Sequence, residues 1–156
     1  VAASTAGGSR VYIHILIPTD GSQLATQAVD RTLQLATTLG ARVTFLMVME
    51  PFHALGLDVD QRAEAGRSDV EARAVVETRK VLAEASAKAK VLGVEFDTLF
   101  ETSDLPYEAI ISTAQARGCD LIAMASHGRS GFAAVLLGST TTKVLTHSKL
   151  PVLVYR

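Results

Sequence analysis

Glycine and hydroxyl residues gather in one segment of the chain, ASHGRSGFAAVLLGSTTTK, which spans residues 125–143. A phosphate group is bound best where backbone N–H groups point inward and the main chain comes close to it. Gly128 and Gly131 have no Cβ and allow such an approach, and Arg129 between them offers charge-assisted hydrogen bonds. Each glycine taken alone is more simply a turn, but their combination favours an anion-binding loop.

A helix is expected to begin near the end of the same segment, running from Ser139 to about His147. The first N–H groups of a helix have no partner within it, and its N-terminus carries a partial positive charge. Gly138 precedes this terminus, and the hydroxyls of Ser139, Thr140 and Thr141 would add donors for an anion. The alternative is that Ser139 only caps the helix.

A second segment of this kind, PTDGS at 18–22, contains the single carboxylate of Asp20. This side chain could accept hydrogen bonds from ribose hydroxyls or help to hold a divalent cation on a phosphate. It could equally form an Asx-turn before the next helix, and both interpretations stay open. Val48 and Met49 end an apolar run and could form a wall for a flat base, although such residues are more often core.

Several standard active-site patterns are absent from the sequence. It has no GxxxxGK[ST] phosphate loop, no GxGxxG dinucleotide fingerprint and no GxSxG nucleophile elbow. The four histidines do not have the spacing of metal ligands, and we identify no nucleophile–base pair. His127 could touch a phosphate or a partner, but a hydrogen-bonded loop residue is the simpler interpretation.

Apolar runs and amphipathic segments alternate along the chain, which indicates a parallel sheet with helices on both faces. Segment 43–49 is apolar at nearly every position, as in a strand covered on both sides, whereas 94–100 is half polar, as in an edge strand. We predict a single-domain α/β fold with a doubly wound five-stranded sheet of order 3-2-1-4-5. The expected strands are 12–18, 43–49, 94–100, 121–124 and 151–155, and the expected helices are 23–39, 68–92, 105–117 and 139–147.

Local signals predict where two of these helices begin or end. Ser22 and Gly40 suit the N-cap and the residue after the last turn of helix 23–39. The SDVE sequence at 68–71 is a capping-box pattern and predicts the start of a long alanine-rich helix. Segment 50–66 before it contains proline and glycine and is expected to be a long loop, a length that is uncommon unless the loop is functional or disordered.

The predicted topology indicates where a ligand would bind. In a doubly wound sheet, ligands bind beyond the carboxyl ends of the strands, where the strand order reverses. With the order 3-2-1-4-5, this point lies between the first and fourth strands. Segments 18–22 and 125–131 leave these two strands, and they are the two segments rich in glycine and hydroxyl groups. Topology and composition therefore select the same place.

The bulk composition limits the kinds of partner. The 156 residues suit one domain, which we assign to 11–156, with 1–10 as a disordered tail or a remnant of cloning. A net charge of −1 gives no general attraction to nucleic acid or anionic membranes, so we expect neither as a partner. The single cysteine, Cys119, allows no intrachain disulfide, and we expect a buried thiol in a cytoplasmic protein.

Four segments of the chain resemble segments of the universal stress protein family in their sequence and in their order along the chain: ILIPTDGS at 15–22, SHGRSG at 126–131, LLGSTTTKV at 136–144 and KLPVLVY at 149–155. The nucleotide-binding branch of that family carries the pattern G-x2-G-x9-G-[ST]. Here the pattern aligns with its spacing intact, from residue 125 to residue 139, but Ala125 stands where the first glycine is expected. The added methyl group could weaken binding, and it would strain the loop if that position required a positive φ.

The resemblance implies an adenine nucleotide alpha hydrolase-like fold and bound ATP, or ADP or AMP, with Mg²⁺ held indirectly through Asp20. It implies adenine near Val48, ribose near Asp20 and Ala125, and phosphates near Gly128, Gly138, Ser139 and Thr140. It also implies a homodimer built through the last strand, Pro151–Tyr155. This strand is an edge without charge, and pairing with a second copy would protect it. The full set of nucleotide-binding residues expected on this basis is Pro18, Thr19, Asp20, Val48, Met124, Ala125, Gly128, Arg129, Gly131, Gly138, Ser139, Thr140 and Thr141.

Three functions are compatible with these features. The leading hypothesis is a dimeric, ATP-binding stress-response regulator in which bound nucleotide changes segment 50–66 or the surface that meets an unknown protein partner. A second is a slow Mg²⁺-dependent ATPase or phosphotransferase, with Asp20 and a metal positioning a water. A third is an interaction protein that binds no nucleotide, in which Ala125 marks a lost site.

Overall fold

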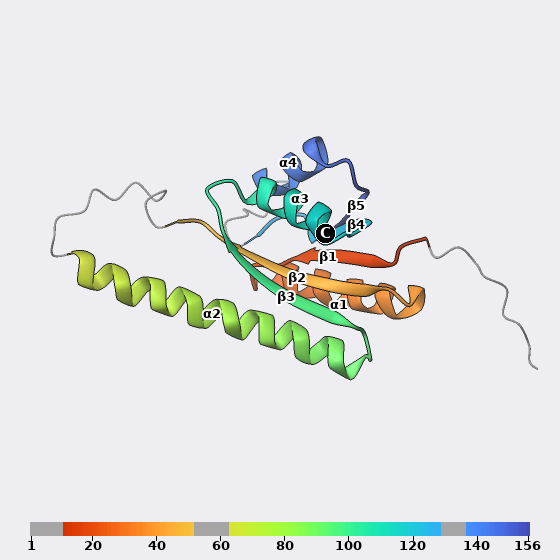
Figure 1. Cartoon of the computed structure of the whole chain (residues 1–156), viewed down its shortest axis with the longest axis horizontal. Coiled ribbons are helices and arrows are strands. Elements are labelled where there is room, and N and C mark those ends of the chain that lie inside the picture. Colours follow the sequence, from red (N-terminus) through yellow and green to blue (C-terminus); the bar gives the residue numbers. More distant parts are fainter. Residues whose placement is uncertain (1–10, 52–62, 129–136) are drawn as a thin grey trace, which may run out of the picture.

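The computed structural model of the chain describes residues 11–51, 63–128 and 137–156, and only the backbone of residues 63–68. Its five strands form one parallel sheet of order β3-β2-β1-β4-β5 (Figure 1), which confirms the predicted fold and strand order. The elements in chain order are β1 (His14–Pro18), α1 (Gln23–Leu39), β2 (Arg42–Met49), α2 (Ala63–Val91), β3 (Phe96–Thr102), α3 (Pro106–Ala116), β4 (Leu121–Ala125), α4 (Ser139–His147) and β5 (Val152–Tyr155).

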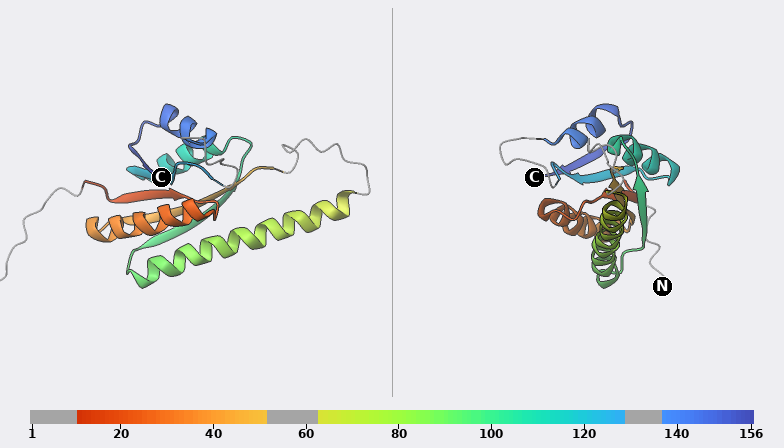
Figure 2. Two further views of the ribbon diagram at one scale, coloured as in Figure 1. Left: turned by 180° about the vertical axis from the view of Figure 1, so that it is seen from behind. Right: turned by 90° about the vertical axis from the view of Figure 1, so that its left-hand side faces the viewer.

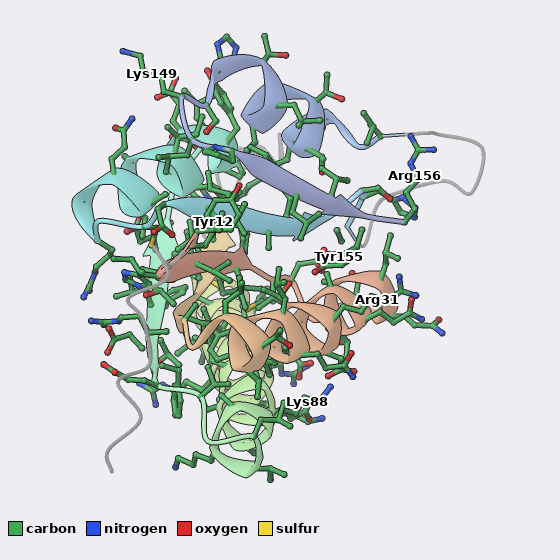
Figure 3. All side chains as sticks on the ribbon, turned by 90° about the vertical axis from the view of Figure 1, so that its right-hand side faces the viewer. Tyr12, Arg31, Lys88, Lys149, Tyr155 and Arg156 are labelled. Atoms are coloured by element: carbon green, nitrogen blue, oxygen red, sulfur yellow. The ribbon has the colours of Figure 1, made fainter. Side chains whose placement is uncertain are left out.

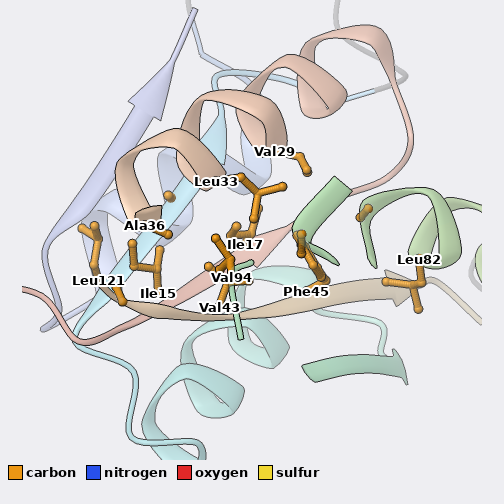
Figure 4. Close-up of a cluster of buried hydrophobic side chains, with 14 of the residues drawn as sticks. Ile15, Ile17, Val29, Leu33, Ala36, Val43, Phe45, Leu82, Val94 and Leu121 are labelled. Carbon is orange, nitrogen blue, oxygen red and sulfur yellow. The ribbon is translucent and has the colours of Figure 1, made fainter. Parts of the chain in front are cut away.

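Helices cover both faces of the sheet. Helices α1 and α2 lie on one side, and α3 and α4 lie on the other (Figure 1 and Figure 2). The core beneath α1 and α2 contains Ile15, Ile17 and Phe45 (Figure 4), whereas Leu16 and Leu46 enter the core beneath α3 and α4. Successive strand residues point to opposite faces, so a strand with two covered faces must be apolar throughout.

The edge strand β3 differs from the central strands in its exposure. Every residue of β1 and β4 is buried, whereas the residues of β3 are half-buried or exposed. Its half-polar sequence therefore predicted the edge position correctly. The strand begins at Phe96, two residues later than expected, because Val94 is still bonded to the end of α2 through Ala89 O.

The ends of α1 agree with the predicted caps. The Ser22 side chain accepts a hydrogen bond from the backbone N–H of Ala25 at 3.2 Å. At the other end, Gly40 has a φ of 61°, the left-handed conformation that glycine adopts without steric cost. Both caps act within a few residues of the helix, which is why the sequence alone was sufficient to predict them.

The predicted start of α2 was wrong. The helix begins at Ala63, so Ser68 and the capping-box pattern lie inside it and residues 63–66 do not belong to a loop. Glycine in a helix costs only about 1 kcal/mol relative to alanine, and Gly66 is flanked by alanine, glutamate and arginine, which favour helix. The rest of the expected long loop, residues 52–62, lies outside the described residues.

The entry into α3 has no polar side chain at its N-cap position. The N-cap is Leu105, whose side chain has no polar group to bond the first turn, and Pro106 occupies the first helical position. Ser103 Oγ instead accepts a hydrogen bond from Leu105 N at 3.1 Å, which fixes the turn before the helix. Among the described helices, none is long and apolar enough to cross a membrane.

Candidate functional site

The predicted switch point exists in the structure, between β1 and β4. These strands are neighbours and parallel, with Leu16 paired to Ile122, so the chain leaves both at the same edge of the sheet. The backbone N–H of Thr19 donates to Leu46 O at 2.9 Å, which extends the pairing of β1 with β2 one residue beyond Pro18. Segments 18–22 and 126–128 are therefore brought side by side by the sheet, as their composition predicted.

Asp20 forms a turn on its own segment and also faces the other segment. Its Oδ1 accepts a hydrogen bond from Ser22 N at 3.0 Å, and Thr19 Oγ1 accepts one from Gly21 N at 3.3 Å. Gly21 has a φ of 74°, which lets this short turn reverse without strain. The Asx-turn interpretation is thus confirmed, and the turn fixes where the remaining carboxylate oxygen, Oδ2, points.

Gly128 packs directly against that carboxylate. A Cβ added at Gly128 would collide with Asp20 Oδ2 and would lie 3.4 Å from Asp20 Cγ. The φ of Gly128 is not positive, so this position needs glycine because space is lacking and not because of an unusual backbone conformation. Rotating Asp20 away would break its bond to Ser22 N. The main chain of one segment and the carboxylate of the other therefore form a single surface.

The start of α4 is held against the same surface. Gly138 N donates to Ser126 O at 2.7 Å, and a Cβ added at Gly138 would lie only 3.2 Å from His127 Cα. Gly138 is the N-cap of α4 and provides no capping side chain, so the first turn is left to other acceptors. This contact places the positive end of the α4 dipole beside the end of β4.

The hydroxyl residues at the start of α4 differ in what they can reach. Thr141 is buried, and its hydroxyl donates to Ala125 O at 3.0 Å, so this proton is already used within the protein. Ser139 is exposed and Thr140 is half-buried. Donors for an anion at this terminus would thus be the first backbone N–H groups and the hydroxyls of these two residues.

The methyl group of Ala125 faces helix α1. Ala125 is buried and packs with Ala25 and Ala28 of α1, and Tyr155 packs against the same group. Figure 3 shows Tyr155 of β5 beside α1. No non-glycine residue has a positive φ in the described parts of the chain, so Ala125 is not strained. The methyl group therefore fills a contact between β4 and α1 and does not strain the backbone.

The apolar residues predicted to surround a base lie at two depths. Met124 is buried in the core beneath α3 and α4, as is Leu46, so its side chain is packing. Val48 is only half-buried against the same core. It lies two residues beyond Leu46, which pairs with Pro18, so Val48 stands at the sheet edge beside Asp20. Pro18 itself is buried.

Glu101 was not among the predicted site residues. It pairs with Val48 across β2 and β3 at the same edge of the sheet. Thr113 of α3 is buried, and its hydroxyl donates to Glu101 Oε1 at 2.8 Å. The only signal in the sequence was a glutamate near the end of an expected strand, and the partner twelve residues away could not be foreseen without the fold.

Arg129 and Gly131, two predicted phosphate ligands, lie outside the described residues. The Ser126 hydroxyl and His127 Nδ1 are 3.1 Å apart, which agrees with the interpretation of His127 as a hydrogen-bonded loop residue. No group of three or more histidine, cysteine, aspartate or glutamate side chains suits a metal ion within the described residues.

His14 begins β1 and Cys119 lies just before β4, so both are at the end of the sheet opposite to Asp20 and Gly128. His14 Nε2 is 2.7 Å from Thr44 Oγ1 inside the protein, and burial lowers the pKa of this histidine from its usual 6.5. Burial also raises the pKa of the Cys119 thiol to about 11. The predicted buried thiol is confirmed, and it is in its unreactive protonated form at neutral pH.

Comparison with known proteins gives consistent matches over nearly the whole chain. A model of the Universal stress protein family matches residues 12–156. Universal stress protein MJ0531 of Methanocaldococcus jannaschii is 28% identical over 149 residues, which cover 96% of this chain and 85% of that protein. The solved structure of hypothetical protein MJ0577, from the same organism, superimposes with a TM-score of 0.77 at 26% identity and covers 92% of this chain and 94% of its own.

A further solved structure was determined with a ligand. It is a universal stress protein in complex with cAMP, 26% identical to this chain, with a TM-score of 0.69. The match covers 93% of this chain and 97% of that one. A protein of similar fold and sequence thus binds an adenine nucleotide.

Proposed function

Because the chain belongs to the universal stress protein family, we propose that it binds an adenosine nucleotide, ATP with Mg²⁺, and acts as a nucleotide-dependent regulator. The observation that carries this proposal is the contact of Gly128 with the Asp20 carboxylate. Two segments more than a hundred residues apart are fitted to each other at the edge where doubly wound sheets bind ligands. The relative that was solved with cAMP supports an adenine nucleotide as the ligand.

The nucleotide would lie along the edge of the sheet with its phosphates toward α4. The N–H groups of Gly128 and of the first turn of α4, with the hydroxyls of Ser139 and Thr140, would hold the phosphates. Asp20 would accept hydrogen bonds from the ribose, and Val48 would pack against the base. The uncharged, half-buried side chain of Val48 and the uncapped start of α4 suit these two roles.

Magnesium would bind mainly through the phosphates. Mg²⁺ prefers six oxygen ligands and usually keeps several waters while it uses one or two carboxylates. Asp20, just beyond the end of β1, is the carboxylate that would contact the hydrated ion. The cation would then help to neutralise the triphosphate, which has no lysine clamp of the GxxxxGK[ST] type in this sequence.

We also propose that two copies of the chain pair through β5. This strand is at the edge of the sheet, and its residues are half-buried. An uncovered edge strand without charged residues is prone to pair with another strand. Pairing of two β5 strands would satisfy the backbone groups that face away from β4.

The nucleotide content of the purified protein gives a direct test. Mass spectrometry of the small molecules released on denaturation should detect ATP, ADP or AMP in an amount comparable to the protein. A second measurement addresses catalysis: ATP turnover should stay at trace level and be insensitive to Asp20→Asn. Steady turnover that this substitution abolishes would replace the regulator with an ATPase.

A further inference from the structure

Four groups stand in a row along the edge of the sheet that would bind the nucleotide. The strand order brings the exit of β4 with Gly128, then Asp20 after β1, then Val48 on β2, and finally Glu101 on β3. Neighbouring strands lie about 4.8 Å apart, so each step moves one strand spacing along the edge. A nucleotide with its phosphates at α4 and its base on Val48 would point the far end of the base toward Glu101.

The Glu101 side chain shares the face on which Val48 lies. Side chains alternate along a strand, and Leu99, two residues earlier, packs in the core beneath α3 and α4 together with Val48. The hydrogen bond from Thr113 of α3 to Glu101 Oε1 confirms this orientation. Glu101 and Val48 therefore lie next to each other on one face of the sheet.

The carboxylate of Glu101 is held in place through one of its two oxygens. Thr113 is 4% exposed, so its hydroxyl offers a fixed donor to Oε1. The other oxygen, Oε2, accepts no hydrogen bond from any part of the chain that the structure describes. Glu101 is only half-buried, so part of its side chain is open to a ligand.

The chemistry of a purine nucleotide matches this arrangement. In a purine nucleoside, the substituent at position 6 projects from the side of the ring system away from the ribose. With the ribose at Asp20 and the base on Val48, that substituent is directed toward β3. A carboxylate only accepts hydrogen bonds, so it favours a substituent that donates, such as the 6-amino group of adenine.

We propose that Glu101, held by Thr113, is a specificity residue that accepts a hydrogen bond from the 6-amino group of the bound base. This proposal rests on the nucleotide function proposed above. A hydrogen bond to a charged group contributes about 1.5–3 kcal/mol. The chain should therefore prefer a 6-aminopurine nucleotide to one without a 6-substituent by about tenfold or more.

Titration calorimetry with two nucleotides tests the proposal. The probes are ATP and purine riboside triphosphate, which has hydrogen in place of the amino group. The variant is Glu101→Leu with Thr113→Val, since replacing both partners avoids leaving the buried Thr113 hydroxyl without an acceptor. The matched control is Glu95→Gln, which removes an exposed carboxylate near the other end of β3, where it meets Arg42.

We expect the parent and the Glu95→Gln control to bind ATP at least about tenfold more tightly than the analogue. The double variant should bind both nucleotides equally, with its affinity for the analogue unchanged, which also shows that the site is still folded. An undiminished preference for ATP in the double variant would overturn the role of Glu101 and leave the nucleotide function standing. A parent that binds neither nucleotide would overturn both proposals.

Discussion

Gly128 and Gly93 are needed as glycines for different physical reasons. Gly93 ends α2 with a φ of 67° and has open space where a Cβ would be, whereas Gly128 has an ordinary backbone and no space, because Asp20 fills it. A left-handed φ costs other residues about 1–2 kcal/mol, which lowers the free energy of unfolding of the whole chain. Crowding at Gly128 acts only on the two segments that meet there.

The substitution Gly128→Ala should therefore weaken ATP binding more than it lowers stability. The new methyl group would displace the Asp20 carboxylate from its turn, and an affinity loss of about tenfold or more is expected because Asp20 and the loop backbone both move. Calorimetry and urea unfolding measure the two effects. Gly93→Ala is the control, with a stability loss of about 1 kcal/mol and unchanged affinity. The reverse pattern would contradict the role given to Gly128.

His14 predicts how stability depends on pH. Its pKa is lowered by burial first and then by Arg42, while Asp120, Asp97 and the backbone of Arg117 oppose the shift. The unfolded chain takes up a proton near pH 6.5 and the folded chain does so only at lower pH, so this residue reduces stability as the pH falls below about 6.5.

The substitution His14→Gln keeps a hydrogen-bonding group for Thr44 but removes the titration. The difference in urea midpoint between about pH 7 and pH 5.5 should be smaller in this variant than in the parent, because only the parent binds the proton preferentially when unfolded. Equal pH dependence in the two proteins would show that His14 is not the titrating group.

At the scale of elements, α1 and α2 show how far a sequence predicts a helix. Both ends of α1 were predicted to the residue because Ser22 and Gly40 act locally. The start of α2 was missed because a good capping-box pattern does not force a helix to begin there when helix-favouring residues precede it. Glu101 was missed for a different reason, since its bond to Thr113 exists only after α3 has packed on β3.

Glycine substitutions in these helices should have opposite signs. Gly66 lies inside α2 without a positive φ, so Gly66→Ala should stabilise the protein by about 0.5–1 kcal/mol. Gly40 ends α1 with a φ of 61°, so Gly40→Ala should destabilise it by about 1 kcal/mol or more. Urea unfolding of both variants checks the signs. Destabilisation by Gly66→Ala would mean that the helix begins after this residue.

For the whole molecule, the strand order was predictable and the packing of single side chains was not. The alternation of apolar and amphipathic segments predicted a doubly wound sheet, and its order brings the two glycine-rich segments to one edge. The direction of the Ala125 methyl group depended on α1 and Tyr155, which pack on it from distant parts of the sequence. The sequence could therefore locate the candidate site but could not predict what a departure from the family pattern does there.

The backbone of β5 allows a test of the proposed dimer. Pro151 O accepts from Ile122 N and Tyr155 O accepts from Ser126 N, so alternate residues of β5 face β4. The odd-numbered residues of β5 face β4, so the even-numbered Val154 directs its N–H away from β4. Val154→Pro removes this donor and leaves the ladder to β4 intact, so sedimentation should change from dimer to monomer. Val154→Ala should stay dimeric, and a dimer that survives the proline would exclude pairing through β5.

Calorimetric titration of the intact chain with ATP and Mg²⁺ tests the central claim most directly. One nucleotide should bind per chain, and Gly138→Val should abolish binding, since its side chain would push α4 away from His127 and the end of β4. No heat of binding at millimolar ATP, or equal binding by the parent and the Gly138→Val variant, would contradict a phosphate site at this edge of the sheet.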